Sequence, residues 1–494
     1  MSISAKSSAW RSAAAILLLG GLPGCAVGPD FGRPEAPPVS HYSAGTDPVA
    51  TAAAAGTAQH FTPGGNVAAD WWRLFKSPQL DAVMADALAH NPSLEAAQAS
   101  LHQAQNDLRA GYGIFYPGLA AQLGAERQRF ATAQFGENLP GPVFNLFSLS
   151  GTISYALDLF GGERRTVEGL AAQVDLRSAT EQATYLTLSS NVAATVIAQA
   201  AYRAELEATE RLIGFQRQQV QLAEIQAEAG TSPYSNVLSL RSQLASSEAA
   251  LPPLRQKLTQ SNDLLATLAG HLPAEWTPPA VRLADLSLPN DLPLSLPAEL
   301  VRQRTDILVA EATAHTASAN VGVATAALFP SLTLSGSYGA DSTSASRIFA
   351  ANGTFWSVGA NLTAPVFDGG TLWYRRKAAI DGYRQAMASY RQVVLSAFAQ
   401  VADTLRALDN DAAALHAADQ ALATAEQALG LVQANYAAGT ATYLDLLNAD
   451  AQFHRAQITD LQAIAVRYQD TVGLFAALGG GWWNAASPLG LGAK

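Results

Sequence analysis

Four short segments of the chain alternate between apolar and polar residues. In the clearest, 147–159, Phe147, Leu149, Ile153, Tyr155 and Leu157 alternate with Ser148, Ser150, Thr152, Ser154 and Asp158. The other three are about 119–130, 331–340 and 354–364. A period of two predicts β-strands with one apolar and one polar face. Runs of roughly 9 to 13 residues also match a tilted strand that crosses a bilayer, apolar side toward lipid and hydroxyl side toward a water-filled lumen.

Two interpretations of these strands are open. A soluble sandwich with one buried face would show the same alternation, but four strands leave most of the chain without a role. A membrane barrel needs about eight strands, so four strands cannot close one. The sequence therefore favours a barrel that several subunits share.

Long helical patterns follow the strands. From Gly370 to Ala438 the chain contains no proline, and a helix of that length would extend roughly 100 Å. Its apolar positions step by threes and fours, as in a coiled-coil seam, with Asp419 as the one defect. Alanine is also frequent at positions outside the seam, which predicts that a second side of the helix packs closely on another helix. Helices packed on two sides form a curved wall. The segment 164–229 shows the same pattern. The seam positions are Val394, Phe398, Val401, Leu405, Leu408, Ala412, Leu415, Leu422 and Leu429.

The chain carries two copies of one plan: a helix, two strands, a long helix, a break and a further helix. Four landmarks recur at offsets of 207 to 213 residues, namely Phe115-Tyr116-Pro117 and Leu328-Phe329-Pro330, Phe160-Gly161-Gly162 and Phe367-Asp368-Gly369, Ala229-Gly230-Thr231 and Ala438-Gly439-Thr440, and Leu268-Ala269-Gly270 and Leu478-Gly479-Gly480. Glycine can close a helix in the left-handed conformation. We therefore predict hairpin tips at Gly230, Thr231, Gly439 and Thr440, although Ala-Gly-Thr alone would also suit a routine loop.

The N-terminus has the order of a secretory signal. Lys6 and Arg11 precede an apolar run of about ten residues, which is too short to remain as a membrane span. Leu22-Pro23-Gly24-Cys25 follows and resembles a bacterial lipobox, in which the cysteine becomes an acylated N-terminus. This predicts a covalent lipid on Cys25, an N-acyl group and an S-diacylglycerol, and no other cofactor. Alternatively, Cys25 is an ordinary thiol in a signal peptide that is removed, since Pro23 is unusual at its position.

These features divide the chain into six parts. We expect a signal peptide at 1–24, an extended strap rich in Pro, Gly and Ala at 25–78, a first repeat at 79–273, a linker at 274–296, a second repeat at 297–481 and a C-terminal tail at 482–494. A segment rich in Pro, Gly and Ala, such as 25–78, cannot bury a core of its own. The strap is therefore expected to run along the body.

Composition excludes several classes of function. Charged residues make up 14% of the chain, below the roughly 25% of soluble domains, and the mean hydropathy is +0.08. The net charge of −10, with no dense run among 30 Lys and Arg, argues against a nucleic-acid partner. One cysteine excludes an intrachain disulfide and a thiolate-rich metal site, and the eight histidines show no ligand spacing. No enzyme motif is present, so we expect no catalytic residues and no metal site.

A set of short motifs, in order along almost the whole chain, carries a family resemblance. These are Cys25 to Phe31, Trp71-Trp72 with Phe75, Ala87-Leu88 with Asn91, Tyr155 with Asp158 and Phe160-Gly161, Asp306-Ile307 with Ala310-Glu311, Gly322-Val323-Ala324, Phe329-Pro330, Pro365 to Gly370, and Ala477 to Trp482. On these residues the chain resembles the TolC-type outer membrane efflux proteins, in the lipoprotein branch that includes OprM and the NodT-like proteins. It departs from them at Arg304-Thr305-Asp306, where the family has Arg-Pro-Asp.

The resemblance implies an α+β membrane protein that catalyses nothing. Three chains with four strands each would form a 12-stranded barrel, above a periplasmic α-barrel of long helices. The implied function is the exit duct of a tripartite efflux system that exports drugs or other toxic small molecules. The implied partners are a second and third copy of the chain, a periplasmic adaptor (membrane fusion) protein, an inner-membrane pump of the resistance-nodulation-division (RND) type, and outer-membrane lipid. Ala26 follows Cys25 where inner-membrane retention would favour Asp, so the expected location is the outer membrane.

The resemblance also implies a periplasmic gate just after the second hairpin tip. Leu444 matches the apolar constriction and Asp445 the first acidic position, whereas Asn448 replaces the second acid. A threefold axis would turn Asp445 into a ring of three carboxylates that attracts cations. Asp450 could substitute for the missing acid. The plainer alternative for Asp445 is a solvated carboxylate on a helix face.

Two other functions stay open on the sequence alone. A type I secretion duct for polypeptides would have the same architecture, although the lipobox and the Gly-Gly-Gly-Trp ending favour efflux. A periplasmic coiled-coil scaffold or adaptor would require the four alternating segments to be soluble. The substrate is not encoded in any recognisable motif.

Overall fold

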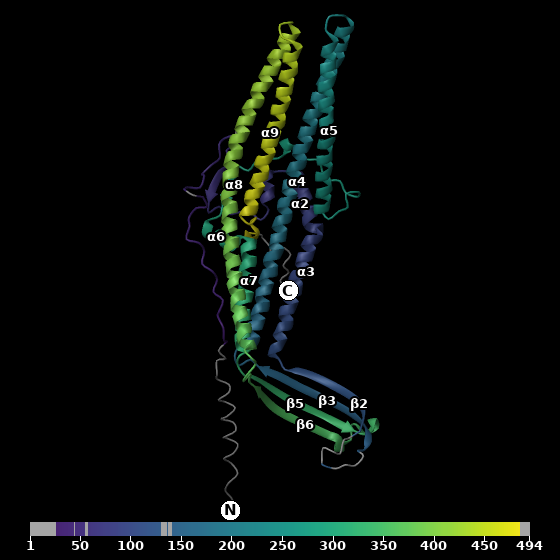
Figure 1. Cartoon of the computed structure of the whole chain (residues 1–494), viewed down its shortest axis with the longest axis vertical. Coiled ribbons are helices and arrows are strands. Elements are labelled where there is room, and N and C mark those ends of the chain that lie inside the picture. The colour runs from purple at the N-terminus through teal and green to yellow at the C-terminus, as the bar shows by residue number, and fades with distance from the viewer. Residues whose placement is uncertain (1–25, 44, 55–57, 130–135, 137–140, 485–494) are drawn as a thin grey trace, which may run out of the picture. The chain divides into compact units, whose positions relative to one another are not determined.

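The structure is a computed structural model that describes residues 26–43, 45–54, 58–129, 136 and 141–484 (Figure 1). The predicted signal peptide, Cys25 and most of the predicted C-terminal tail lie outside the described residues. The helices are α2 (Pro78–His90), α3 (Pro92–Gly111), α4 (Gly162–Glu228), α5 (Tyr234–Leu268), α6 (Pro297–Gln303), α7 (Thr305–Ala326), α8 (Thr371–Ala437) and α9 (Tyr443–Ala477). The strands are β1 (His60–Pro63), β2 (Gly118–Arg129), β3 (Val143–Leu157), β4 (Asp291–Leu294), β5 (Ser331–Ser342) and β6 (Thr354–Thr363).

The chain divides into two compact units, and the division falls within α3, α4, α7 and α8. The first unit comprises the described residues of Met1–Arg33, His102–Leu176 and Glu311–Ser389, and the second those of Pro34–Leu101, Arg177–Ala310 and Tyr390–Lys494. The first unit therefore holds the larger sheet. The second holds β1, β4 and the C-terminal parts of the long helices.

The larger sheet has four antiparallel strands in the order β2-β3-β5-β6. Its register aligns Ala121 with Gly151, Gly151 with Tyr338, and Tyr338 with Trp356. Directly paired residues point to the same face of a sheet. The predicted apolar positions of all four strands therefore share one face. The opposite face is rich in hydroxyl groups, and Ser337 and Ser357 exchange a hydrogen bond across it at 2.7 Å.

The second strand differs from its predicted range of 147–159. β3 begins four residues earlier, at Val143, because the pairing with β2 continues to Arg129. It ends two residues earlier, at Leu157, because the Asp158 side chain instead accepts hydrogen bonds from the first turn of α4. The end of the strand is thus set by a helix cap rather than by the apolar alternation.

The apolar face of this sheet is exposed in the chain. Leu119 and Val358 are each 81% exposed and Trp356 is 74% exposed. β2 and β6 form the two edges, and neither pairs with a further strand of the described chain. Unpaired edges next to an exposed apolar face form a surface suited to contact with another molecule.

An aromatic core lies in the second unit. Trp71 is fully buried and stacks on Phe475 of α9, with ring centroids 5.2 Å apart. Next to it the predicted strap contributes β1, which pairs in parallel with β4. Arg467 of α9 is only 1% exposed and donates hydrogen bonds to Gln59, Thr51 and the Ala54 carbonyl. Residues of the predicted strap therefore take part in the core of the second unit.

Two helical hairpins of equal length follow the two sheet halves. α4 and α8 each have 67 residues, and α5 and α9 each have 35. In α8 the seam predicted from the sequence is buried at Val401, Leu405, Leu408 and Ala412, which are all fully shielded. Among the described helices, none combines the length and the apolar character that crossing a membrane requires.

Candidate functional site

The two hairpin tips have the same geometry. Gly230 and Gly439 have φ angles of +74° and +77°, which residues with a side chain rarely adopt. The following residues, Thr231 and Thr440, each donate a backbone hydrogen bond of 2.9 Å to the carbonyl five residues earlier. Their hydroxyl groups donate to the same carbonyls, at 2.9 and 3.0 Å. Ala-Gly-Thr is therefore a helix-ending motif that satisfies carbonyls the helix would leave unpaired.

The second tip continues into a capping box at the start of α9. Thr442 accepts a hydrogen bond from the Asp445 backbone N–H at 3.2 Å, and its own N–H donates to the Asp445 carboxylate at 2.8 Å. The Thr442 hydroxyl also donates to that carboxylate, at 2.5 Å. These bonds favour the ionised form and lower the pKa of Asp445 below its usual value. Asp445 is thus a fixed, exposed negative charge.

The residues predicted to form a gate share one exposed face of α9. Leu444 is 62% exposed, and Asp445 and Asn448 are exposed as well. Asp450, considered as a substitute for the acid missing at Asn448, lies on the opposite face and is only 5% exposed. Burial raises the pKa of the Asp450 carboxyl, and the Gln216 side chain only partly offsets this. Asp450 therefore does not present a charge beside Asp445.

The buried face of the second tip packs on the first hairpin. Val220 and Ala223 of α4 and Val237 and Leu240 of α5 form a small apolar cluster. Tyr443 and Leu447, at the start of α9, pack against this cluster. Burial raises the pKa of the Tyr443 hydroxyl. One face at the start of α9 is therefore packed against α4 and α5, and the opposite face is accessible to other molecules.

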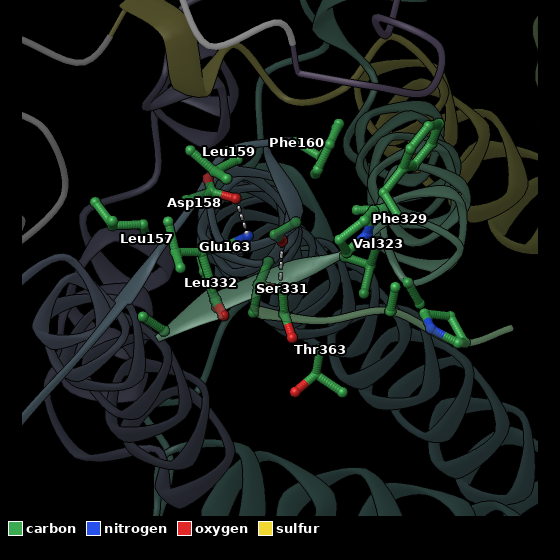
Figure 2. Close-up of a pocket in the computed structure, with 18 of the residues that line it drawn as sticks. Leu157, Asp158, Leu159, Phe160, Glu163, Val323, Phe329, Ser331, Leu332 and Thr363 are labelled. Atoms are coloured by element: carbon green, nitrogen blue, oxygen red, sulfur yellow. Dashed lines mark hydrogen bonds between the residues drawn. The ribbon is translucent and has the colours of Figure 1, made fainter. Parts of the chain in front are cut away.

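Aspartates cap both long helices where they leave the sheet. Asp158 accepts a hydrogen bond from the backbone N–H of Glu163 at 3.2 Å (Figure 2). It accepts a second one from the backbone N–H of Arg164 at 3.0 Å. Asp368 does the same in the second copy, from Gly370 and Leu372 at 2.9 and 2.7 Å. The Leu372 and Gly370 bonds lower the pKa of Asp368.

A cavity of about 490 Å³ lies beside the first of these caps and is lined by residues of β3, β5, α4 and α7. Figure 2 shows Leu157, Leu332 and Phe329 around it, with polar groups at Asp158 and Thr363. The cavity adjoins the ends of strands in the sheet whose apolar face is exposed. We therefore treat it as part of that exposed surface and assign it no ligand.

The segment that follows Cys25 is anchored in the first unit. The Val27 N–H donates to the Phe160 carbonyl at 3.0 Å, and a Cβ at Gly161 would lie 2.5 Å from the Ala26 Cα. Arg165, whose side chain is 6% exposed, forms ion pairs with Asp30 at 2.6 Å and Glu168 at 2.7 Å. The residue next to Cys25 therefore lies against the turn between β3 and α4.

Several of these contacts were not predicted from the sequence. The Thr-x-x-Asp spacing at Thr442 and Asp445 is a helix-start signature that would have identified the capping box. Asp158 and Asp368 were recognised only as parts of motifs, although an Asp before a glycine turn and a helix is a common cap. Nothing in the sequence pattern pointed to Arg165, because its partner Asp30 is 135 residues away.

Comparison with known proteins gives a consistent result. The family model described as Outer membrane efflux protein matches residues 83–271 and 296–480. The pyoverdine export outer membrane protein OpmQ of Pseudomonas aeruginosa is 32% identical over 423 residues, which cover 83% of this chain and 87% of OpmQ. The probable outer membrane lipoprotein SilC of Salmonella typhimurium is 27% identical over 467 residues, covering 93% and 96%. The solved outer-membrane channel OprN superimposes with a TM-score of 0.83 at 27% identity, over 93% of this chain and 100% of that one.

Proposed function

The chain belongs to the outer membrane efflux protein family and is an outer-membrane exit duct, and from this premise we propose that it works as a homotrimer in a tripartite efflux system. Three copies of the four-stranded sheet would combine into a 12-stranded barrel. The long helices of the three copies would form a hollow periplasmic wall below it. Solutes would pass through without chemical change.

One observation supports a barrel shared between several copies of the chain: the sheet has an exposed apolar face and two open edges. Unpaired backbone groups in a bilayer cost several kcal/mol each, so a membrane-embedded sheet must close on itself. Pairing β2 of one subunit with β6 of the next would satisfy both edges. The apolar face with Trp356 and Val358 would then contact lipid, and the hydroxyl face with Ser337 and Ser357 would contact water.

We propose that Cys25 carries the lipid predicted from the lipobox, with an N-acyl group and an S-diacylglycerol. The position of Ala26 against Gly161 supports this, because it brings the chain just after Cys25 next to the end of β3. A lipid attached there would reach the bilayer that surrounds the sheet. The lipoprotein character of the relative SilC points the same way.

The proposed partners are a periplasmic adaptor protein and an RND-type inner-membrane pump. The proposed cargo is drugs or other toxic small molecules, and the relative OpmQ is named for the export of pyoverdine. Choice among cargoes would rest with the pump, because a wide water-filled tunnel selects weakly. We assign the chain no reaction.

The proposed gate is the exposed face of α9 with Leu444, Asp445 and Asn448. Around a threefold axis the fixed charge of Asp445 would form a ring of three carboxylates, which attracts cations and disfavours anions. Leu444 would form an apolar constriction next to it. Opening would be a shift between two arrangements of these helices, biased by the bound adaptor and pump.

The trimer can be tested by cross-linking the two sheet edges. In a Cys25→Ser background, Ala121→Cys on β2 and Ala360→Cys on β6 place one thiol on each edge, both on the apolar face. A short bifunctional thiol reagent should then give dimer and trimer bands on a denaturing gel and nothing larger. Each single cysteine variant is the matched control and should give no trimer. A ladder that ends at two, or extends beyond three, would contradict the proposed assembly.

A further inference from the structure

We propose that Asp86, His90 and His271 form a binding site for one divalent transition-metal ion of the Zn²⁺ class. The sequence alone gave no sign of it, because His271 is 185 residues from Asp86 and the histidines show no ligand spacing. The site lies in the second unit, away from the hairpin tips, and does not depend on the proposed gate or trimer.

The three side chains converge from two helix ends. His90 Nδ1 lies 2.7 Å from one carboxylate oxygen of Asp86, and His271 Nε2 lies 2.9 Å from the other. One potential ligand atom from each residue lies within 4.8 Å of the other two. Two imidazoles and a carboxylate are therefore gathered around one point.

The backbone is shaped to bring these residues together. His90 is the last residue of α2, and His271 follows directly after Gly270, which ends α5 with a φ of +78°. A Cβ at Gly270 would collide with the His90 carbonyl, so only glycine permits this close approach. The Asn91 side chain donates to the Leu268 carbonyl at 2.9 Å and ties the two helix ends to each other.

The electrostatics of the site favour a cation. The C-terminus of a helix carries a partial negative charge, and here α2 and α5 end side by side. The Asp86 carboxylate adds a full negative charge to the same place. Trp276 stacks on His271, with ring centroids 5.5 Å apart, which holds the imidazole plane in position.

The ligand types indicate which ion would bind. Imidazole nitrogen and carboxylate oxygen are ordinary Zn²⁺ ligands, and three protein ligands with one open position form a common Zn²⁺ coordination. With metal–ligand bonds of about 2.0–2.1 Å, tetrahedral ligand atoms lie about 3.3 Å apart. The N–O distances of 2.7 and 2.9 Å would widen by about half an ångström as the ion replaces the hydrogen-bonded protons. The His90 side chain is 57% exposed, so water can fill the open position.

The first test is titration of the detergent-purified protein with ZnCl₂ after treatment with EDTA. Isothermal titration calorimetry should show one ion bound per chain. His90→Ala and His271→Ala should each weaken the affinity at least about tenfold, since each removes one ligand. His102→Ala is the matched control, because His102 is an exposed histidine of α3 that is not one of the three ligands, and it should leave the affinity unchanged. Absence of stoichiometric binding, or equal binding by wild type and both ligand variants, would overturn the proposal.

A second measurement needs no substitution and so does not depend on the folding of a variant. Diethylpyrocarbonate modifies accessible imidazoles, and mass spectrometry reports the modified histidines. Zn²⁺ should reduce labelling of His90 and His271 severalfold while leaving labelling of His102 unchanged. If labelling of the two ligand histidines is the same with and without Zn²⁺, the three side chains are a hydrogen-bonded group only and the proposal fails.

Discussion

The helices of the two hairpins have equal lengths, but the charges that face each other across each hairpin differ. Across the first hairpin, three ion pairs join α4 to α5: Arg217 with Glu248 at 2.7 Å, Arg241 with Glu224 at 2.6 Å, and Arg255 with Glu210 at 3.0 Å. Across the second, two carboxyl groups have raised pKa values, first because of burial and then because a carboxylate of the other helix lies nearby: Asp411 of α8 beside Asp470, and Asp460 of α9 beside Asp419.

This difference indicates which hairpin is easier to move. Exposed ion pairs contribute about 0–1 kcal/mol each, but three in a row along one hairpin all favour the same closed arrangement. Two facing carboxyl pairs oppose close packing once they are ionised. The second hairpin also carries Leu444, Asp445 and Asn448 on its exposed face. We therefore expect the helices of the second hairpin to separate more easily than those of the first.

The largest expected effect concerns the anchor of the second hairpin. Arg467→Leu removes a buried guanidinium and leaves the Gln59 side-chain oxygen, itself fully buried, without its donor. The free energy of unfolding should fall by about 2–4 kcal/mol. Arg217→Leu in the first hairpin is the matched control, since its side chain is 63% exposed, and it should cost less than about 1 kcal/mol. Thermal unfolding midpoints of both variants decide this, and similar losses would remove the contrast.

The next effect concerns the exposed face of the second tip. Asp445→Ala removes the proposed charged ring and half of the capping box, so conductance in planar bilayers should rise and block by multivalent cations should weaken. The lost cap should also lower the thermal stability of the chain slightly. Thr442→Ala separates the two roles, because it weakens the cap while the carboxylate stays. If both variants raise the conductance by the same amount, the cap matters and the charge does not. Unchanged conductance in Asp445→Ala removes Asp445 from the gate.

A smaller effect is expected from pH. Burial and then the neighbouring Asp470 raise the pKa of Asp411 to about 7, and Arg467 only partly opposes this. The folded protein therefore holds a proton that the unfolded chain has released, between its ordinary value of 3.8 and about 7. The free energy of unfolding should fall as pH rises through this range and level off above it. Asp411→Asn should flatten part of that decline, which thermal midpoints at pH 5 and pH 8 would reveal. A decline of unchanged size would show that the pair is unimportant.

Much of the architecture was accessible from the sequence because its signals are local. Alternation with a period of two depends on neighbouring residues only, and it predicted the common apolar face that the register of Tyr338 and Trp356 displays. The absence of proline from Gly370 to Ala438 likewise matches α8, which spans Thr371–Ala437. Glycine at positions 230 and 439 marked the two helix ends, and both have positive φ angles.

Other features depend on contacts between distant parts of the chain. The carboxyl pair of Asp411 and Asp470 arises only once α8 and α9 are packed together. The burial of Asp450 depends on α4, and its sequence neighbourhood suggested an exposed acid instead. The sequence does not show whether a charged residue of a helix faces water or another helix. The burial of Asp450 and the pairing of Asp411 with Asp470 could therefore be found only in the structure.

The smallest expected effect tests the ion pairs of the first hairpin. Arg241 is 52% exposed and donates two hydrogen bonds to Glu224, so Arg241→Gln should lower the midpoint of thermal unfolding only slightly at low salt. The loss should shrink in 1 M NaCl, because salt screens exposed charges. If the three ion pairs act together, the triple variant with Arg217→Gln and Arg255→Gln should lose more stability than the three single variants added together. Hydrogen exchange along α5 would then rise toward that of α9, whereas an unchanged exchange rate would mean that apolar packing, and not charge, distinguishes the two hairpins.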